Sequence, residues 1–353
     1  MRPLRGADNH LAGLFRSQGN ATHSGQDRLS DIPEFGSNPG GLRARTYTPV
    51  DLPPGAPLVV VLHGCTQTAA GYDYGSGWSS LADRHGFALL FPEQQRSNNP
   101  NLCFNWFRPG DCRRDAGEPL SIRQMIESFV TSHGIDRRRI FVTGLSAGGA
   151  MASVMLATYP DVFAGGAIIA GLPYGCANTV PEAFDRMKGN GLADADGLVR
   201  GASGHGGPWP IVSVWHGSAD QTVHPANAEA ILRQWRMVHG LGEKPTRNEM
   251  VDSYPRRVWC DGDGRALIEM YTITGMAHGT PLAAQGSDGC GASGPHMLEA
   301  NISSTRRIAE FWGLTASIHK DTARATGAQS WSRGIGSIQK TITDALRAAG
   351  LIK

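Results

Sequence analysis

The stretch "RIFVTGLSAGGAMASVML" (Arg139–Leu156) decides the fold, because it changes from a strand pattern to a helix pattern around one serine. An apolar run typical of a buried strand precedes "GLSAG" (Gly144–Gly148), and apolar residues at helical spacing follow it. A G-x-S-x-G motif between a strand and a helix predicts a nucleophile elbow with Ser146 at the helix N-terminus. A packing turn whose serine only caps the helix is the plainer alternative. A phosphate loop is disfavoured because the G-K-[S/T] ending is missing.

Short apolar runs alternate with helical patterns on both sides of this turn. The predicted buried strands are "PLVVVLHG" (57–64) and "FALLFPEQ" (87–94). Further predicted strands are "FAGGAIIAG" (163–171), "IVSVWHG" (211–217) and the alternating "LIEMYTITG" (267–275). Strands that alternate with helices indicate an α/β fold with a mostly parallel central sheet and helices on both faces. "LRARTYTP" (42–49) also alternates, and we expect an antiparallel edge strand there.

The same patterns predict the domain organisation. Residues 1–36 are polar and lack periodicity, so we expect an N-terminal extension, followed by a catalytic domain over residues 37–314. Within that domain, residues 172–210 are rich in turn-forming residues and predict a cap-like insertion over the active-site edge. Residues 315–353 predict a linker and a C-terminal amphipathic helix.

The composition of the chain limits the classes of binding partner that we expect. The 33 Lys and Arg residues and 31 Asp and Glu residues give a formal charge of +2, which does not favour a nucleic-acid or membrane partner. No apolar run approaches the ~20 residues of a membrane helix, and the N-terminus lacks the apolar segment of an export signal. The six cysteines form no C-x-x-C pair, so we expect no metal site.

A serine nucleophile needs a histidine base and an acid that orients it. In the fold that a nucleophile elbow implies, the chain order is serine, acid, histidine, each following a strand. Asp220 in "HGSADQTV" and His278 in "GMAHGT" meet both conditions, so we predict that they complete a triad with Ser146. The competing acids lie in the insertion or in a hairpin turn: Asp194, Asp196, Asp261 and Asp263.

Two backbone N–H groups are expected to stabilise the oxyanion. The first is that of Ala147, directly after the nucleophile. The second belongs to the "HGC" loop after the 57–64 strand, and is that of Cys65 or its neighbour Thr66. A tight strand-to-loop turn would also explain His63 and Gly64, and the two explanations are compatible.

Aromatic and histidine side chains on loops are the candidates for substrate contact, because loops carry most binding residues. We expect Trp106, Tyr174 and His224 to line the cleft, with core packing as the alternative for the tryptophan. The remaining loop histidines are His205, His216 and His296. His216 is expected to pack beneath the Asp220 loop.

These residues and several longer motifs resemble the polyhydroxybutyrate depolymerase family of esterases, in the α/β-hydrolase superfamily. The resemblance spans residues 38–314 and rests on "VVVLHGCTQTAAGYDYGSGWSSLADRHGFALLFPEQ", "CFNWF", "SIRQMI", "GLSAGGAM", "AGLPYG", "HGSADQTV" and "GMAHGTPL". It implies an α/β-hydrolase fold and ester hydrolysis through an acyl-serine, without a cofactor. It also implies the triad above and an oxyanion loop that begins at Cys65.

The chain departs from the secreted polymer-degrading members of that family. We find no signal peptide and no granule-binding domain, which predicts a cytoplasmic protein as written, although relatives are often secreted. Short-chain esters or soluble hydroxyalkanoate oligomers are therefore the expected substrates. The alternatives are a feruloyl or acetylxylan esterase, acyl transfer to another alcohol, and a non-catalytic binding protein of the same fold. The sequence predicts no oligomeric state.

Two disulfides are proposed, although spacing alone does not determine connectivity. Cys65 and Cys103 both flank loops on the catalytic edge, so we expect them to pair. A bond between Cys260 and Cys290 would close a loop around His278.

Overall fold

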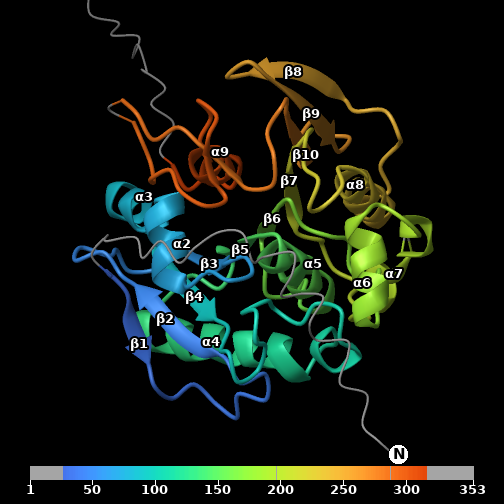
Figure 1. The fold of residues 1–353 in the computed structure, drawn as a ribbon. Coiled ribbons are helices and arrows are strands. Elements are labelled where there is room, and N and C mark those ends of the chain that lie inside the picture. The colour runs from blue at the N-terminus through green and yellow to red at the C-terminus, as the bar shows by residue number, and fades with distance from the viewer. Residues whose placement is uncertain (1–26, 196, 287, 316–353) are drawn as a thin grey trace, which may run out of the picture. The chain divides into compact units, whose positions relative to one another are not determined.

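A ten-stranded mixed sheet forms the centre of the computed structural model, which describes residues 27–195, 197–286 and 288–315. Its strands are β1 (Ser30–Ile32), β2 (Arg43–Tyr47), β3 (Leu58–Leu62), β4 (Ala88–Glu93), β5 (Ile140–Leu145), β6 (Gly165–Ile169), β7 (Ile211–Gly217), β8 (Arg247–Val251), β9 (Tyr254–Cys260) and β10 (Ala266–Ile273). They run in the order β1-β2-β4-β3-β5-β6-β7-β10-β9-β8 (Figure 1). From β4 to β10 in this order, all neighbouring strands are parallel, which confirms the predicted α/β sheet.

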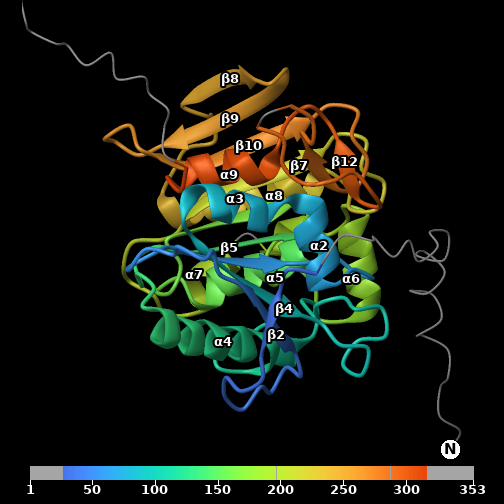
Figure 2. The ribbon, with the colours of Figure 1, turned by 90° about the vertical axis from the view of Figure 1, so that its left-hand side faces the viewer.

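Helices cover both faces of the sheet (Figures 1 and 2). One face carries α2 (Ala69–Ser76), α3 (Trp78–His85) and α9 (Ser304–Phe311), and the other carries α4 (Gly117–His133), α5 (Ala147–Thr158) and α8 (Ala226–His239). Successive strand side chains point to opposite faces, so Val60 joins the core beneath α4 and α5 while Val59 joins the core beneath α3. Because both faces are covered, every residue of β3 and β5 is buried, as their unbroken apolar patterns predict.

The two edges of the sheet are antiparallel. The predicted edge position of β2 is wrong, because β2 lies between β4 and β1. The outer strand β1 comes from residues that the sequence analysis assigned to an extension, where three residues are too few to show alternation. At the other edge β8, β9 and β10 form a meander, and the predicted hairpin turn with Asp261 and Asp263 connects β9 to β10. The predicted C-terminal linker and helix lie outside the described residues.

Loops at the carboxyl ends of the parallel strands gather the candidate site residues at one edge, where α/β sheets bind ligands. Between β6 and β7 the insertion contains α6 (Val180–Met187), η2 (Leu192–Ala195) and α7 (Leu198–Gly201), where the sequence predicted one short helix. Beyond β10, a small parallel sheet of β11 (Thr280–Leu282) and β12 (Met297–Glu299) follows His278.

Candidate active site

Ser146 occupies a strained turn between β5 and α5. Its backbone has φ 57° and ψ −117°, and its N–H donates to Ile169 O at 2.9 Å. A non-glycine residue with this conformation is costly and persists only where its surroundings enforce it. A Cβ at Gly148 would lie 2.3 Å from Leu62 O, and one at Gly144 would lie 2.4 Å from Gly148 O. The close approach of three backbone segments therefore explains the glycines that flank the serine.

Asp220 and His278 are hydrogen-bonded to each other, although 58 residues separate them in sequence. His278 Nδ1–H donates to Asp220 Oδ2 at 2.7 Å, and both side chains are buried. The second carboxylate oxygen, Oδ1, accepts the N–H groups of Thr222 and Val223, each at 2.9 Å. With Nδ1 held by the carboxylate, Nε2 of His278 is the nitrogen left to act as a base.

His216 packs beneath the loop that carries Asp220 and lies close to the Asp220 carboxylate. Its Nε2–H donates to Val223 O at 2.8 Å and lies 3.4 Å from Asp220 Oδ2, as the predicted packing beneath the loop requires. Burial alone would raise the pKa of Asp220, but hydrogen bonds from His216 and His278 outweigh it and lower that pKa below its ordinary value. Asp220 is therefore ionised throughout the neutral pH range.

His296 lies against the loop that carries His278 rather than in the pocket. Its Nδ1–H donates to His278 O at 3.1 Å, and the two imidazole rings pack edge to face at 5.7 Å. Burial lowers the pKa of His296, which keeps the ring neutral beside His278. Of the competing acids, Asp194 lies in η2 and Asp261 in the β9–β10 turn, whereas Asp196 is outside the described residues.

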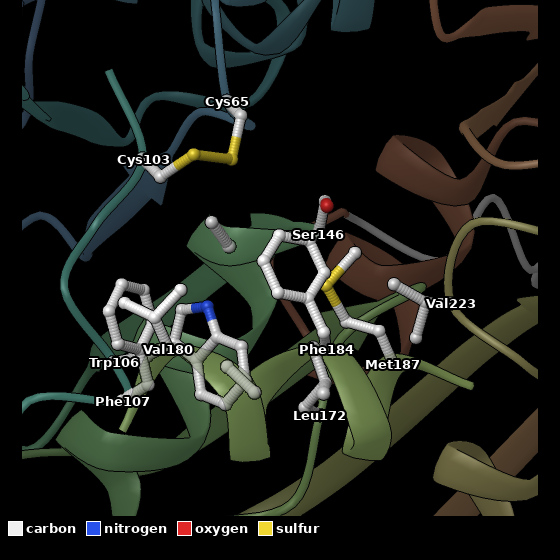
Figure 3. Close-up of a pocket in the computed structure, with 12 residues that line it drawn as sticks. Cys65, Cys103, Trp106, Phe107, Ser146, Leu172, Val180, Phe184, Met187 and Val223 are labelled. Carbon is white, nitrogen blue, oxygen red and sulfur yellow. A yellow bond between two sulfur atoms is a disulfide. The ribbon is translucent and has the colours of Figure 1, made fainter. Parts of the chain in front are cut away.

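An apolar pocket opens beside Ser146 (Figure 3). Its lining residues are Cys65, Cys103, Trp106, Phe107, Ser146, Ala147, Leu172, Val180, Ala183, Phe184, Met187 and Val223. Trp106 lines it as predicted, but Tyr174 and His224 do not. The Tyr174 hydroxyl donates to Cys112 O at 3.2 Å, and the imidazole of His224 packs over Gly189.

Sequence reasoning missed the α6 wall of this pocket. Val180, Ala183, Phe184 and Met187 have the i, i+3, i+4, i+7 spacing of one helix face. This spacing was readable in "VPEAFDRM", but the surrounding turn residues concealed it. The insertion therefore contributes a helix face where the sequence analysis expected single aromatic residues.

The loop after β3 carries the expected oxyanion donor and is tied to a second loop. The predicted Cys65–Cys103 disulfide is present, and Thr66 N–H donates to Asn101 O at 2.8 Å. Both Cys65 and Ala147 line the pocket near Ser146. Ala147 is the first residue of α5, so its N–H has no acceptor within the helix.

The proposed Cys260–Cys290 disulfide is wrong. Both cysteines are free and buried. Cys260 ends β9 opposite Ala266, whereas the Cys290 thiol donates to Gly77 O at 3.2 Å, between α2 and α3.

Across residues 27–195, 197–286 and 288–315, no three His, Cys, Asp or Glu side chains are grouped so that they could hold a metal ion. Over the same ranges, no helix has the length and apolarity to span a bilayer.

A strained serine, a carboxylate-bound histidine and an apolar pocket at one edge of this sheet define a carboxylic ester hydrolase of the α/β-hydrolase fold. Comparison with known proteins agrees with this class and narrows it. The family model described as "Esterase PHB depolymerase" matches residues 46–248. The chain therefore belongs to the esterase family of polyhydroxybutyrate depolymerases.

Individual relatives include esterases with several substrates. The chain is 47% identical over 291 residues to poly(3-hydroxyalkanoate) depolymerase C of Paucimonas lemoignei, covering 81% of this chain and 70% of that protein. It is 33% identical to feruloyl esterase B of Neurospora crassa, covering 73% and 90%. Among solved structures, the acetyl xylan esterase of Aspergillus awamori superposes with a TM-score of 0.67 at 25% identity, covering 81% of this chain and 99% of that one.

Proposed function

We propose that this protein hydrolyses hydroxyalkanoate esters of the 3-hydroxybutyrate type through an acyl-serine intermediate. The observation that carries the proposal is the apolar pocket that Ser146 lines. The 2.7 Å hydrogen bond between His278 and Asp220 supports it, because it leaves Nε2 of His278 available as a base. The identity of 47% to a poly(3-hydroxyalkanoate) depolymerase supports this substrate class.

Each residue has a definite part in the proposed reaction. His278 Nε2 takes the proton of Ser146 as Oγ attacks the ester carbonyl, and the ionised Asp220 stabilises the resulting imidazolium. The N–H groups of Ala147 and Cys65 bind the oxyanion of the tetrahedral intermediate. His278 then protonates the leaving alcohol, and a water deprotonated by the same histidine releases the acyl group.

The apolar pocket supports this choice of acyl group. Its walls are carbon-rich side chains of α6 and the Trp106 loop, so an aliphatic acyl chain would bury its methyl and methylene groups there. A feruloyl or acetylxylan esterase is the second candidate, favoured by the Neurospora relative and the Aspergillus structure.

Hydrolysis rates on a small set of esters test the proposal. We expect wild type to cleave the 3-hydroxybutyrate dimer or trimer and p-nitrophenyl butyrate with higher kcat/KM than p-nitrophenyl acetate or methyl ferulate. Ser146→Ala should abolish turnover of all of them. Preference for acetyl or feruloyl esters would favour the second candidate, and full activity of Ser146→Ala would refute the acyl-serine.

A further inference from the structure

A buried carboxyl that the proposed chemistry does not use lies behind the oxyanion loop. Glu118 is the second residue of α4 and is fully buried. Its Oε1 accepts hydrogen bonds from Gln94 Nε2 at 2.7 Å, Asn105 Nδ2 at 2.7 Å and Asn98 Nδ2 at 3.1 Å. Its Oε2 accepts the backbone N–H of Asn105 at 2.9 Å. Burying a carboxyl among neutral amides is costly, so its position needs a reason.

The orientation of these amides is set by their other partners. Gln94 Oε1 accepts the N–H of Gln95 at 2.9 Å, and Asn105 Oδ1 accepts from Asn99 Nδ2 at 3.0 Å. The amino groups of Gln94 and Asn105 must therefore face Glu118. Four donors converge on one carboxyl group, an arrangement that matches the carboxylate form.

One ionisable group of the neighbouring η1 turn (Pro109–Asp111) acts on this carboxyl, namely Asp111. Burial, together with the like charge of Asp111, raises the pKa of Glu118 to about 8, against the hydrogen bonds that lower it. Burial, with smaller contributions from the charges of Asp111 and Glu118, raises the pKa of the nearby Cys112. The helix N-terminus at Glu118 is the place where a negative charge is best tolerated.

Through Gln94, this cluster reaches the oxyanion loop. The Gln94 backbone N–H donates to His63 Nε2 at 3.1 Å, so the proton of this neutral imidazole is on Nδ1, which donates to Gly64 O at 2.8 Å. Gly64 O and the Cys65 N–H belong to one peptide unit, which is planar and trans. Holding the carbonyl therefore sets the direction of the N–H that we propose as an oxyanion donor.

Through Asn105, the same carboxyl holds the wall of the pocket. Both the backbone and the side chain of Asn105 donate to Glu118, and the next residue, Trp106, lines the pocket. Gln94 Nε2 also donates to Cys103 O at 3.0 Å, beside the disulfide to Cys65. One buried group thus contacts the supports of both loops.

We propose that Glu118 is a positioning residue for ester hydrolysis. Its carboxyl fixes the position of the oxyanion loop, through Gln94 and His63, relative to the pocket wall that begins at Asn105. This role rests on the proposed function, because it concerns the geometry in which the ester carbonyl is polarised.

Glu118→Gln tests this role, because the new amino group would face at least one of the converging N–H donors. At a pH above 8 we expect kcat for p-nitrophenyl butyrate to fall roughly 10- to 100-fold, with a smaller change in KM, as for small misplacements of catalytic groups. An alkylboronic acid, which bonds to the serine and places an oxygen in the oxyanion site, should bind more weakly by the same factor. Glu118→Asp should recover part of the loss.

Glu127→Gln is the matched control, since Glu127 lies on the same helix but pairs with Arg123 and Arg137 at the surface. It should leave kcat unchanged. If Glu118→Gln unfolds, Gln94→Met carries the test: it keeps the backbone donor to His63, removes the link to Glu118 and should lower kcat in the same direction.

Three results would overturn the role or its basis. The positioning role would be refuted if Glu118→Gln kept the kcat and the boronate affinity of wild type. It would also be refuted if the only effect of Glu118→Gln were a lower thermal stability. A folded Gln94→Met with unchanged kcat would contradict the link to the oxyanion loop. Wild type that cleaves no ester would instead refute the proposed function itself.

Discussion

The proposed chemistry depends on single residues whose backbone conformation or ionisation is unfavourable in isolation and is stabilised by their neighbours. Ser146 keeps a left-handed backbone since Gly144 and Gly148 allow three backbone segments to meet around it. Asp220 stays ionised although buried, because two imidazoles and two backbone N–H groups satisfy it. For Glu118, burial and the charge of Asp111 outweigh the hydrogen bonds that it accepts, so its environment opposes its ionisation.

This difference predicts how stability depends on pH. The folded pKa of Glu118, about 8, is above its ordinary value of 4.5, so between these values the folded state retains a proton that the unfolded state has lost. Stability then falls as pH rises through this window. We expect the free energy of unfolding of wild type to fall relative to that of Glu118→Gln from pH 4.5 to 8, and the difference to level off above.

Urea unfolding at a series of pH values measures this difference, with Glu127→Gln as the surface control. A difference that stays constant from pH 4.5 to 8 would show that the four hydrogen bonds keep Glu118 ionised throughout.

Sequence patterns predicted the residues that follow strands, but not those that act through buried contacts. Asp220 and His278 could be predicted from the sequence because the carboxyl ends of parallel strands lie at one edge of the sheet. Glu118 carries no such signal, since one glutamate early in a helix is ordinary in any sequence. Tyr174 and His224 were misplaced because a loop position does not say which way a side chain points.

Among the secondary-structure elements, α6 forms one wall of the pocket beside Ser146. It supplies Val180, Ala183, Phe184 and Met187 to the pocket from an insertion between β6 and β7. Its N-cap, Thr179, accepts the N–H of Glu182, and Pro181 in the first turn suits a helix start. The helix is thus defined locally, and its apolar face is free to set the size of the pocket.

Shortening one side chain of this helix should change acyl-chain preference. Phe184→Ala removes a ring that lines the pocket, so longer acyl chains gain space while butyryl esters lose contacts. We expect the ratio of kcat/KM for p-nitrophenyl octanoate over butyrate to rise roughly 10-fold, a size typical of apolar pockets. Asp185→Ala, at the exposed neighbour, is the control. An unchanged ratio would exclude α6 from chain-length selection.

Elements with long, regular patterns were predicted well, and short ones were not. The buried strands and α8 follow from apolar runs and helical spacing. Three-residue strands such as β1, β11 and β12 are too short for a pattern, so their pairing depends on tertiary contacts that the sequence does not display.

At the scale of the whole molecule, the parallel sheet brings distant segments to one catalytic edge. The proposed oxyanion loop follows β3, Ser146 follows β5, Asp220 follows β7 and His278 follows β10. Family membership and the fold agree on an ester hydrolase. The central claim is that this edge works by covalent catalysis at Ser146.

Trapping the acyl-enzyme tests that claim most directly. Wild type, Ser146→Ala and Ser80→Ala, which alters an exposed serine, would be mixed with p-nitrophenyl butyrate, quenched during the first turnover and mapped by peptide mass spectrometry. We predict a butyryl group on the peptide that contains Ser146 in wild type and Ser80→Ala, and none in Ser146→Ala. Acylation of another residue, or turnover by Ser146→Ala, would contradict the account.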